Sequence, residues 1–307
     1  MPWMKRWPGA FPISVQSAKG ARFIDVDGIE YIDFCLGDTG SMTGHAVTEI
    51  TDAIARQLSR GSTVMLPSED STWVGAELTK RFGLAKWQFS VSATDANRFV
   101  LRLARHITKR PKILVHDWCY HGTVDETLVI ADDKGQTISR HGAIGPQVHP
   151  SLTTRVVPFN DLEKLEQQLS FGDVACMLIE PALTNIGIVL PDPGYLAGVR
   201  ELTRKHGTLL IIDETHTICA GPGGATKLWN LEPDMLVIGK TIGGGIPVAA
   251  YGLSAELAAR AELSLDSHDV DVSGLGGTLS GSVLAMAAVK ATLTHSLLPS
   301  QFEKTIS

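Results

Sequence analysis

One lysine, Lys240, stands between an apolar run and three glycines in the stretch PDMLVIGKTIGGGIPVAAYG, residues 233–252. The apolar run is typical of a buried strand, so the lysine amine would project from a rigid support. The glycines at 243–245 remove side chains and allow positive φ, which lets the backbone pass close to a ligand. A lysine there can form a Schiff base with an aldehyde once it loses its proton. On this segment alone, a surface lysine ending a strand remains the alternative.

A carboxylate, Asp213, ends LLIID at 209–213, the most apolar strand-like run of the chain. Placing a carboxylate there costs free energy unless a proton, a cation or hydrogen-bond donors meet it. The side chain could cap the next element, or it could balance the charge of a bound group.

A third signal lies in SVSATDANRFVLRLARHI, where apolar residues recur at helical spacing from Ala96 onward. This spacing predicts a helix that begins about Asp95, with Ser92 or Thr94 as its cap. Small hydroxyl residues at a helix N-terminus suit a phosphate, although an ordinary cap is equally consistent with this segment. Further on, CYHG at 119–122 offers Tyr120 as a flat partner for an aromatic ring.

Each of these signals is weak alone, but together they cover every contact that an aromatic aldehyde cofactor with a phosphate needs. They supply an anion site, a stacking aromatic, a carboxylate for a ring nitrogen and an imine-forming lysine. This combination suits pyridoxal 5'-phosphate (PLP), whose protonated pyridine ring acts as an electron sink.

The elements that must position these residues are strands alternating with helices. Five apolar runs are expected to be strands covered on both faces: 112–116, 155–159, 175–179, 209–213 and 235–239. Helical patterns at 161–169 and 194–205 lie between them, which predicts an α/β fold with a largely parallel sheet. In such a sheet the ligand crevice lies beyond the carboxyl ends of the strands. The first 60 residues differ, because they predict a hairpin turning at Asp27-Gly28 and a helix at 47–59.

Composition excludes several classes of function. The net charge of -6, with Lys and Arg scattered, argues against a nucleic-acid partner. No apolar run is long enough to span a bilayer and the start has no signal-like segment, so we expect no membrane partner and a cytoplasmic protein. The four cysteines form no C-x-x-C pair, and no histidine spacing indicates a metal site, so no metal is expected.

The chain resembles the class III, fold type I PLP aminotransferases, within them the group around glutamate-1-semialdehyde aminomutase. The segments that carry the resemblance are KGARFIDVDGIEYIDF, GHA at 44–46, SATDANRFVLRLAR, CYHG, IEPALTNIG, LLIIDETHT, EPDMLVIGKTIGGGIPVAAYG and GGTLSGSVLAMAA. They occur in the family's order over roughly residues 19 to 290. The resemblance implies a large domain with a mostly parallel central sheet covered by helices.

The resemblance also implies roles for single residues. Lys240 would carry the cofactor and move the proton, Asp213 would contact the pyridine nitrogen, and Tyr120 would stack on the ring; these three are the expected catalytic residues. The other expected cofactor-binding residues are Ser92, Ala93, Thr94, His121, Glu180, Asn185, His216 and Thr278. Thr278 resembles a threonine that reaches the phosphate of a partner subunit, which implies a homodimer with shared active sites.

Three departures from the family pattern stand out. Ala93 and Asp95 replace the glycine and glutamate of the usual S-G-T-E-A turn, and a methyl at 93 requires an ordinary backbone angle or strain. The loop GDTGSMTGH at 37–45 lacks the tryptophan of the aminomutases. Members usually continue well beyond the threonine motif into a small C-terminal domain, so we expect either that this chain is a fragment or that the C-terminal small domain is absent. We expect an N-terminal segment at 1–60, a PLP-binding large domain at 61–290 and the start of a truncated part at 291–307.

The expected activity is transfer of an amino group from an amine or amino acid to a keto or aldehyde acceptor. The alternatives are an aminomutase of the glutamate-1-semialdehyde type and a PLP-binding but catalytically silent homologue. The sequence does not identify a substrate. Four arginines are candidates for a carboxylate-binding residue without a decisive spacing: Arg22, Arg56, Arg60 and Arg140.

Overall fold

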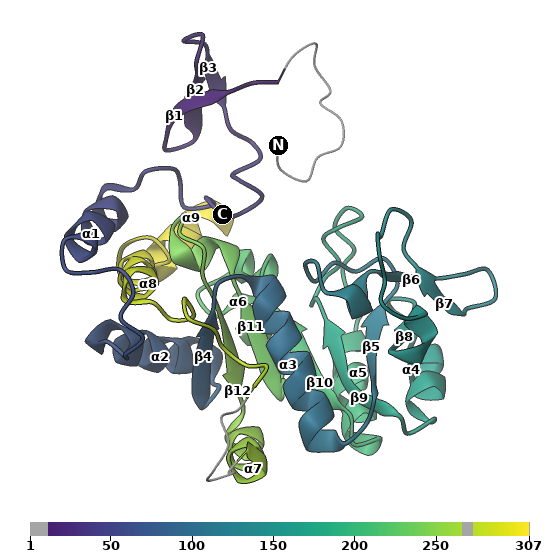
Figure 1. The fold of residues 1–307 in the computed structure, drawn as a ribbon. Coiled ribbons are helices and arrows are strands. Elements are labelled where there is room, and N and C mark those ends of the chain that lie inside the picture. Colours follow the sequence, from purple (N-terminus) through teal and green to yellow (C-terminus); the bar gives the residue numbers. More distant parts are fainter. Residues whose placement is uncertain (1–11, 266–272, 307) are drawn as a thin grey trace.

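The centre of the protein is a seven-stranded sheet with the order β4-β12-β11-β10-β9-β5-β8 (Figure 1). We describe it from a computed structural model that covers residues 12–265 and 273–306. In this sheet β12 runs antiparallel to both of its neighbours, and the other pairs are parallel. The strands are β4 (Lys86–Ser90), β5 (Lys112–His116), β8 (Thr154–Val157), β9 (Val174–Ile179), β10 (Leu209–Asp213), β11 (Met235–Ile238) and β12 (Ala249–Leu253).

Helices cover both faces of this sheet (Figure 1). The α-helices of the described residues are α1 (Thr48–Leu58), α2 (Glu69–Phe82), α3 (Ala93–Thr108), α4 (Leu162–Leu169), α5 (Tyr195–Lys205), α6 (Gly224–Leu228), α7 (Ala255–Leu265), α8 (Val283–His295) and α9 (Pro299–Ile306). Short 3-10 helices are η1 (Asp125–Thr127), η2 (Pro150–Leu152), η3 (Thr217–Ala220) and η4 (Lys240–Gly243).

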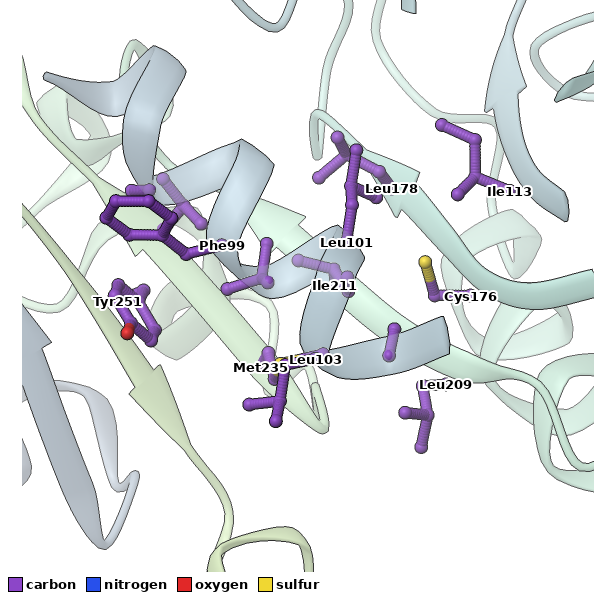
Figure 2. Packing of buried hydrophobic residues seen from close by; sticks show 14 of the residues in the cluster. Phe99, Leu101, Leu103, Ile113, Cys176, Leu178, Leu209, Ile211, Met235 and Tyr251 are labelled. Carbon is purple, nitrogen blue, oxygen red and sulfur yellow. The ribbon is translucent and has the colours of Figure 1, made fainter. Parts of the chain in front are cut away.

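The helix α3 and the helices α4 and α5 bury opposite faces of the central strands. Figure 2 shows Phe99, Leu101 and Leu103 of α3 packed beside the strand residues Leu178 and Ile211. The intervening strand residues face the other way, against α4 and α5. Because both faces are covered, every residue of β9, β10 and β11 is buried, which explains why these strands are apolar throughout.

The N-terminal segment forms a separate antiparallel sheet, β1 (Val15–Lys19), β2 (Arg22–Asp25) and β3 (Glu30–Ile32), which stands away from the central sheet (Figure 1). The turn between β2 and β3 contains Gly28 at φ 81°, so the hairpin predicted there is confirmed. A further hairpin pairs β6 (Val129–Ala131) with β7 (Thr137–Ser139).

All five predicted strands and the predicted helices are present, with small differences at their ends. The helix expected from Asp95 begins at Ala93, two residues earlier, because the Ser92 side chain accepts a hydrogen bond from the N–H of Asp95 and caps it. The expected domain boundary at residue 290 falls inside α8, and the division into domains stays a prediction. Within 12–265 and 273–306, no helix is both long and apolar enough to cross a membrane.

Candidate active site

A cavity of about 670 Å³ opens where β5, β9, β10 and β11 end, and this volume lies in the usual range for small-molecule sites. The predicted site residues that line it are Ser92, Ala93, Thr94, Tyr120, His121, Glu180, Asn185, Asp213, His216 and Lys240. These residues are up to 148 positions apart in sequence. The parallel topology brings them together because it collects the carboxyl ends of the strands at one edge.

The carboxylate of Asp213 is buried and surrounded by donors. Its Oδ2 accepts hydrogen bonds from Nδ2 of Asn97 at 2.9 Å and pairs with Nδ1 of His121 at 2.9 Å. Its Oδ1 accepts from the N–H and the hydroxyl of Thr215. Asp213 is 4% exposed and faces the cavity, so the network fixes a negative charge at the cavity wall.

The pKa directions support an ion pair between Asp213 and His121. Burial alone would raise the pKa of Asp213, but hydrogen bonds from His121, Thr215 and Asn97 outweigh it and lower the pKa. Burial alone would lower the pKa of His121, but the neighbouring Cys119 and Asp213 raise it well above its usual value. Asp213 is therefore ionised at neutral pH, and its carboxylate lies at the cavity wall.

The N-terminus of α3 forms another wall of the cavity. The N–H groups of Ala93 and Thr94 belong to the first turn and have no partner within the helix. Ala93 lies in the helix, and its φ is not positive, so the methyl introduces no backbone strain. A Cβ added to Gly122 would lie 2.1 Å from Oγ1 of Thr94, and one added to Gly239 would lie 3.0 Å from Cβ of Ala93. Two glycines thus permit close packing beside the first turn of α3, whose free N–H groups suit an anion.

The amine of Lys240 contacts two polar side chains of the cavity lining. Its Nζ donates a hydrogen bond to Oδ2 of Asp38 at 2.8 Å and lies 2.7 Å from Nε2 of His216. Burial and the charge of Lys240 lower the pKa of His216, so the imidazole is neutral at neutral pH and can accept a hydrogen bond from the lysine ammonium. Lys240 itself has φ 48°, an uncommon angle for a non-glycine residue, at the start of η4.

The loops after β5 and β9 meet through Glu180, which is 3% exposed. Its carboxylate accepts hydrogen bonds from the N–H of Tyr120 and from the N–H and hydroxyl of Thr184. Tyr120 is 39% exposed and lines the cavity, so it is free to contact a ligand. Asn185 is an exposed residue of the same rim.

Thr278 does not line this cavity. It lies in a separate hollow together with Met65, Leu66 and Phe89, and its side chain is exposed. The four candidate arginines are also absent from the described cavity lining. Arg22 pairs with Glu30 on the N-terminal sheet, for example.

Several residues of the site escaped sequence reasoning. Asp38 contacts Lys240 from a loop 202 positions away, and no spacing rule connects the two. Asn97 gave a usable signal, because it is a polar residue on the apolar face of α3. Glu214 follows Asp213 and is fully buried; it accepts hydrogen bonds from Thr217, Ala225 and Thr226, and burial raises its pKa. It ties the loop after β10 together.

PLP fits the residues present. Asp213 offers an ionised carboxylate, the start of α3 offers free N–H groups, and Lys240 offers an amine, all on one cavity. In addition, Nε2 of His121 is buried without a hydrogen-bond partner in the described part of the chain, and His121 lines the cavity. An orphaned polar atom at a cavity wall is the kind of group that a bound molecule or water satisfies.

Comparison with known proteins gives consistent matches. The family Aminotransferase class-III matches residues 3–303. Glutamate-1-semialdehyde 2,1-aminomutase of Thermodesulfovibrio yellowstonii is 37% identical over 290 residues, which cover 93% of this chain and 66% of that protein. A crystal structure of a glutamate-1-semialdehyde-aminomutase from Pseudomonas aeruginosa PAO1 has a TM-score of 0.95 and 50% identity, with 98% of this chain and 67% of that chain covered.

An omega-transaminase from Sphaerobacter thermophilus has the same fold, with a TM-score of 0.86, 30% identity, and 97% of this chain and 69% of that chain covered. The chain spans about two thirds of the length of these relatives. The predicted fold type I architecture is confirmed. Because the family match covers nearly the whole sequence, the chain belongs to the class III aminotransferases.

Proposed function

We propose that the protein is a PLP-dependent aminotransferase, which moves an amino group from an amine or amino acid to a keto or aldehyde acceptor. One observation carries the proposal: Lys240 and the ionised Asp213 line the same cavity, which also contains the N-terminus of α3. When bound, PLP would supply an aldehyde that joins an amine and a pyridine ring that accepts electron density.

The residues of the chain would divide the work. The first turn of α3, at Ser92, Ala93 and Thr94, would bind the phosphate through its N–H groups and hydroxyls. Tyr120 would lie against the ring, and Asp213, oriented by His121, would hold the positive charge of the ring nitrogen. Glu180, Asn185 and His216 would shape the remaining walls.

Lys240 would have two tasks. Its Nζ would hold the cofactor until a substrate amine takes its place, and the released amine would then move a proton from the substrate carbon. His216 lies 2.7 Å from Nζ and is neutral, so its Nε2 can accept a hydrogen bond from the lysine amine and hold it in position.

Spectroscopy on the purified protein tests this proposal. Addition of PLP should give a yellow protein, an amine donor should bleach it, and a keto acid should restore the colour. Lys240→Ala should abolish the colour change and turnover. A Lys240→Ala protein with the original absorbance and full turnover would remove the assignment, and a yellow protein inert to every amine would favour the catalytically silent alternative.

The second candidate is an aminomutase, in which one substrate donates and regains the amino group. The relatives named glutamate-1-semialdehyde 2,1-aminomutase favour it. At the loop before Gly44-His45, this chain has Thr39, hydrogen-bonded to His216, and no tryptophan. Product analysis with an external keto acid separates the two: amino transfer to the acceptor favours the aminotransferase.

We also propose a homodimer in which Thr278 reaches the active site of the partner. Support comes from its exposed position outside the Lys240 cavity and from exposed apolar neighbours, Met65 at 75%, Leu66 at 69% and Leu279 at 55%. Light scattering should give twice the mass of the chain, and Thr278→Ala should weaken PLP binding; a monomer that binds PLP fully would contradict it. A cytoplasmic location stays a prediction.

A further inference from the structure

The cavity contains a carboxylate that the proposed chemistry leaves without a role. Oδ2 of Asp38 lies 2.8 Å from Nζ of Lys240, the atom that would exchange with a substrate amine. The Asp38 side chain is 62% exposed and lies at the cavity wall. A substrate amine that replaces the lysine amine must therefore approach this charge.

The loop that carries Asp38 is held in an uncommon conformation. Leu36, Asp38 and Thr39 all have positive φ, between 52° and 66°. Two anchors maintain it: Asp33 accepts hydrogen bonds from the N–H groups at 35 and 36 and pairs with His45 at 2.6 Å. Backbone strain of this kind persists where the surrounding structure fixes it, and it is concentrated at functional sites. The position of Asp38 is thus determined by the fold.

Asp38 is the carboxylate of the described cavity lining that a substrate can pair with, because the other two carboxylates already accept hydrogen bonds from the protein. Glu180 is occupied by three donors from Tyr120 and Thr184, and Asp213 by four. Among the described residues of the lining there is no arginine to bind a carboxylate. When Lys240 has given its amine to the cofactor, Asp38 loses the cation that it now pairs with.

We propose that Asp38 is a specificity-determining residue, which selects amine donors with a second positive group and disfavours donors with a carboxylate beside the reacting amine. This inference rests on the proposed function and names its substrate class. A second ammonium group would replace the Lys240 ammonium as the partner of Asp38. A carboxylate on the adjacent carbon would meet Asp38 as a like charge. The expected order of donors is diamine, simple monoamine, α-amino acid.

The effect has a modest expected size because Asp38 is more than half exposed. Two unit charges about 4 Å apart in a water-like medium change an equilibrium by about fivefold. We therefore expect about a fivefold preference of 1,4-diaminobutane over butylamine, and a similar step from butylamine to alanine.

Equilibrium binding provides a test without turnover. In Lys240→Ala protein free of cofactor, Asp38 has no lysine partner, and calorimetry with 1,4-diaminobutane, butylamine and alanine should give the order above. Asp38→Asn in the same background should reduce each step to about onefold. Asparagine tolerates the left-handed backbone at this position, and Asp38→Gly repeats the test with the other residue that does so. Asp133→Asn, an exposed acid outside the cavity, is the matched control for the loss of one charge.

Protein loaded with PLP provides a second test of the inference. The donor concentration that half-bleaches the cofactor should follow the same order, and Asp38→Asn should remove it while Asp133→Asn preserves it. Equal or tighter binding of alanine than of the diamine, or an order unchanged by Asp38→Asn, would overturn the inference. Failure of the proposed function looks different: no colour with PLP, or no bleaching by any donor, whatever the calorimetry shows.

Discussion

The buried histidine at the end of β5 should make the protein sensitive to mild acid. His116 has no exposed surface, and its Nε2 lies 2.7 Å from the hydroxyl of Tyr195. Its ring also contacts Phe159 edge-on, at 4.8 Å between centroids. Nδ1 is buried and has no hydrogen-bond partner among the described residues, so no group stabilises a second proton.

The size of the effect follows from the pKa of His116, which burial lowers from 6.5 to about 3. Between these values the unfolded chain binds a proton that the folded protein does not, so stability rises with pH. The stability that neutral His116 contributes is fully present above the pKa of the unfolded chain. It is lost as the pH falls toward the pKa of His116 in the folded protein. From about pH 7 to about pH 5 the loss is about 2 kcal/mol, and the whole interval corresponds to about 5 kcal/mol.

Urea unfolding at a series of pH values measures this directly. Carboxylates with lowered pKa, such as Asp173, also destabilise the protein in acid, so the wild type must be compared with His116→Gln. The difference in unfolding free energy between the two should change by about 2 kcal/mol from about pH 7 to about pH 5, in favour of the variant. His141→Gln, at an exposed position, controls for removal of a histidine as such. Parallel pH curves for wild type and His116→Gln would refute the reasoning.

Three further predictions concern the site and the core. Gly122→Ala should lower the unfolding free energy by more than the roughly 1–2 kcal/mol of left-handed strain, because the added Cβ would lie 2.1 Å from Oγ1 of Thr94. Thermal melts should show that adding Thr94→Ala restores part of the lost stability. A Gly122→Ala protein as stable as the wild type would contradict this packing. Leu165→Ala should cost about 2–5 kcal/mol in urea unfolding because the side chain is fully buried between α4 and the sheet, and a cost below about 1 kcal/mol would place it outside the core. Asp213→Asn should lower the pKa of His121, measured by NMR titration, because it removes the paired anion; an unchanged value would show that the pair is not ionic.

Much of the fold was predictable because the parallel strands have a strong composition signal. The strands β9, β10 and β11 are apolar without interruption, since helices cover both faces. The antiparallel strand β12 was missed because its sequence AAYGL has little β propensity and its pairing with β4 joins segments far apart in sequence. The N-terminal hairpin was predictable from its Asp-Gly turn.

The site was predictable where residues follow strand ends and unpredictable where loops supply them. Asp213 ends β10 and Lys240 follows β11 by two residues, and the topology then requires them to face one crevice. Asp38 belongs to a loop whose path depends on Asp33, His45 and several positive φ angles, which no local pattern encodes. The network behind Asp213 was hidden for a related reason: Asn97 and His121 come from elements that meet only in the folded protein.

The most direct test of the central claim is to locate the covalent bond to the cofactor. The protein is loaded with PLP, reduced with borohydride and digested, and its peptides are analysed by mass spectrometry. The added pyridoxyl mass should lie on the peptide that contains Lys240 and on no other, and Asp213→Ala should reduce the amount bound. A mass on a different lysine, or a coloured protein in which Lys240 stays unmodified, would contradict the account.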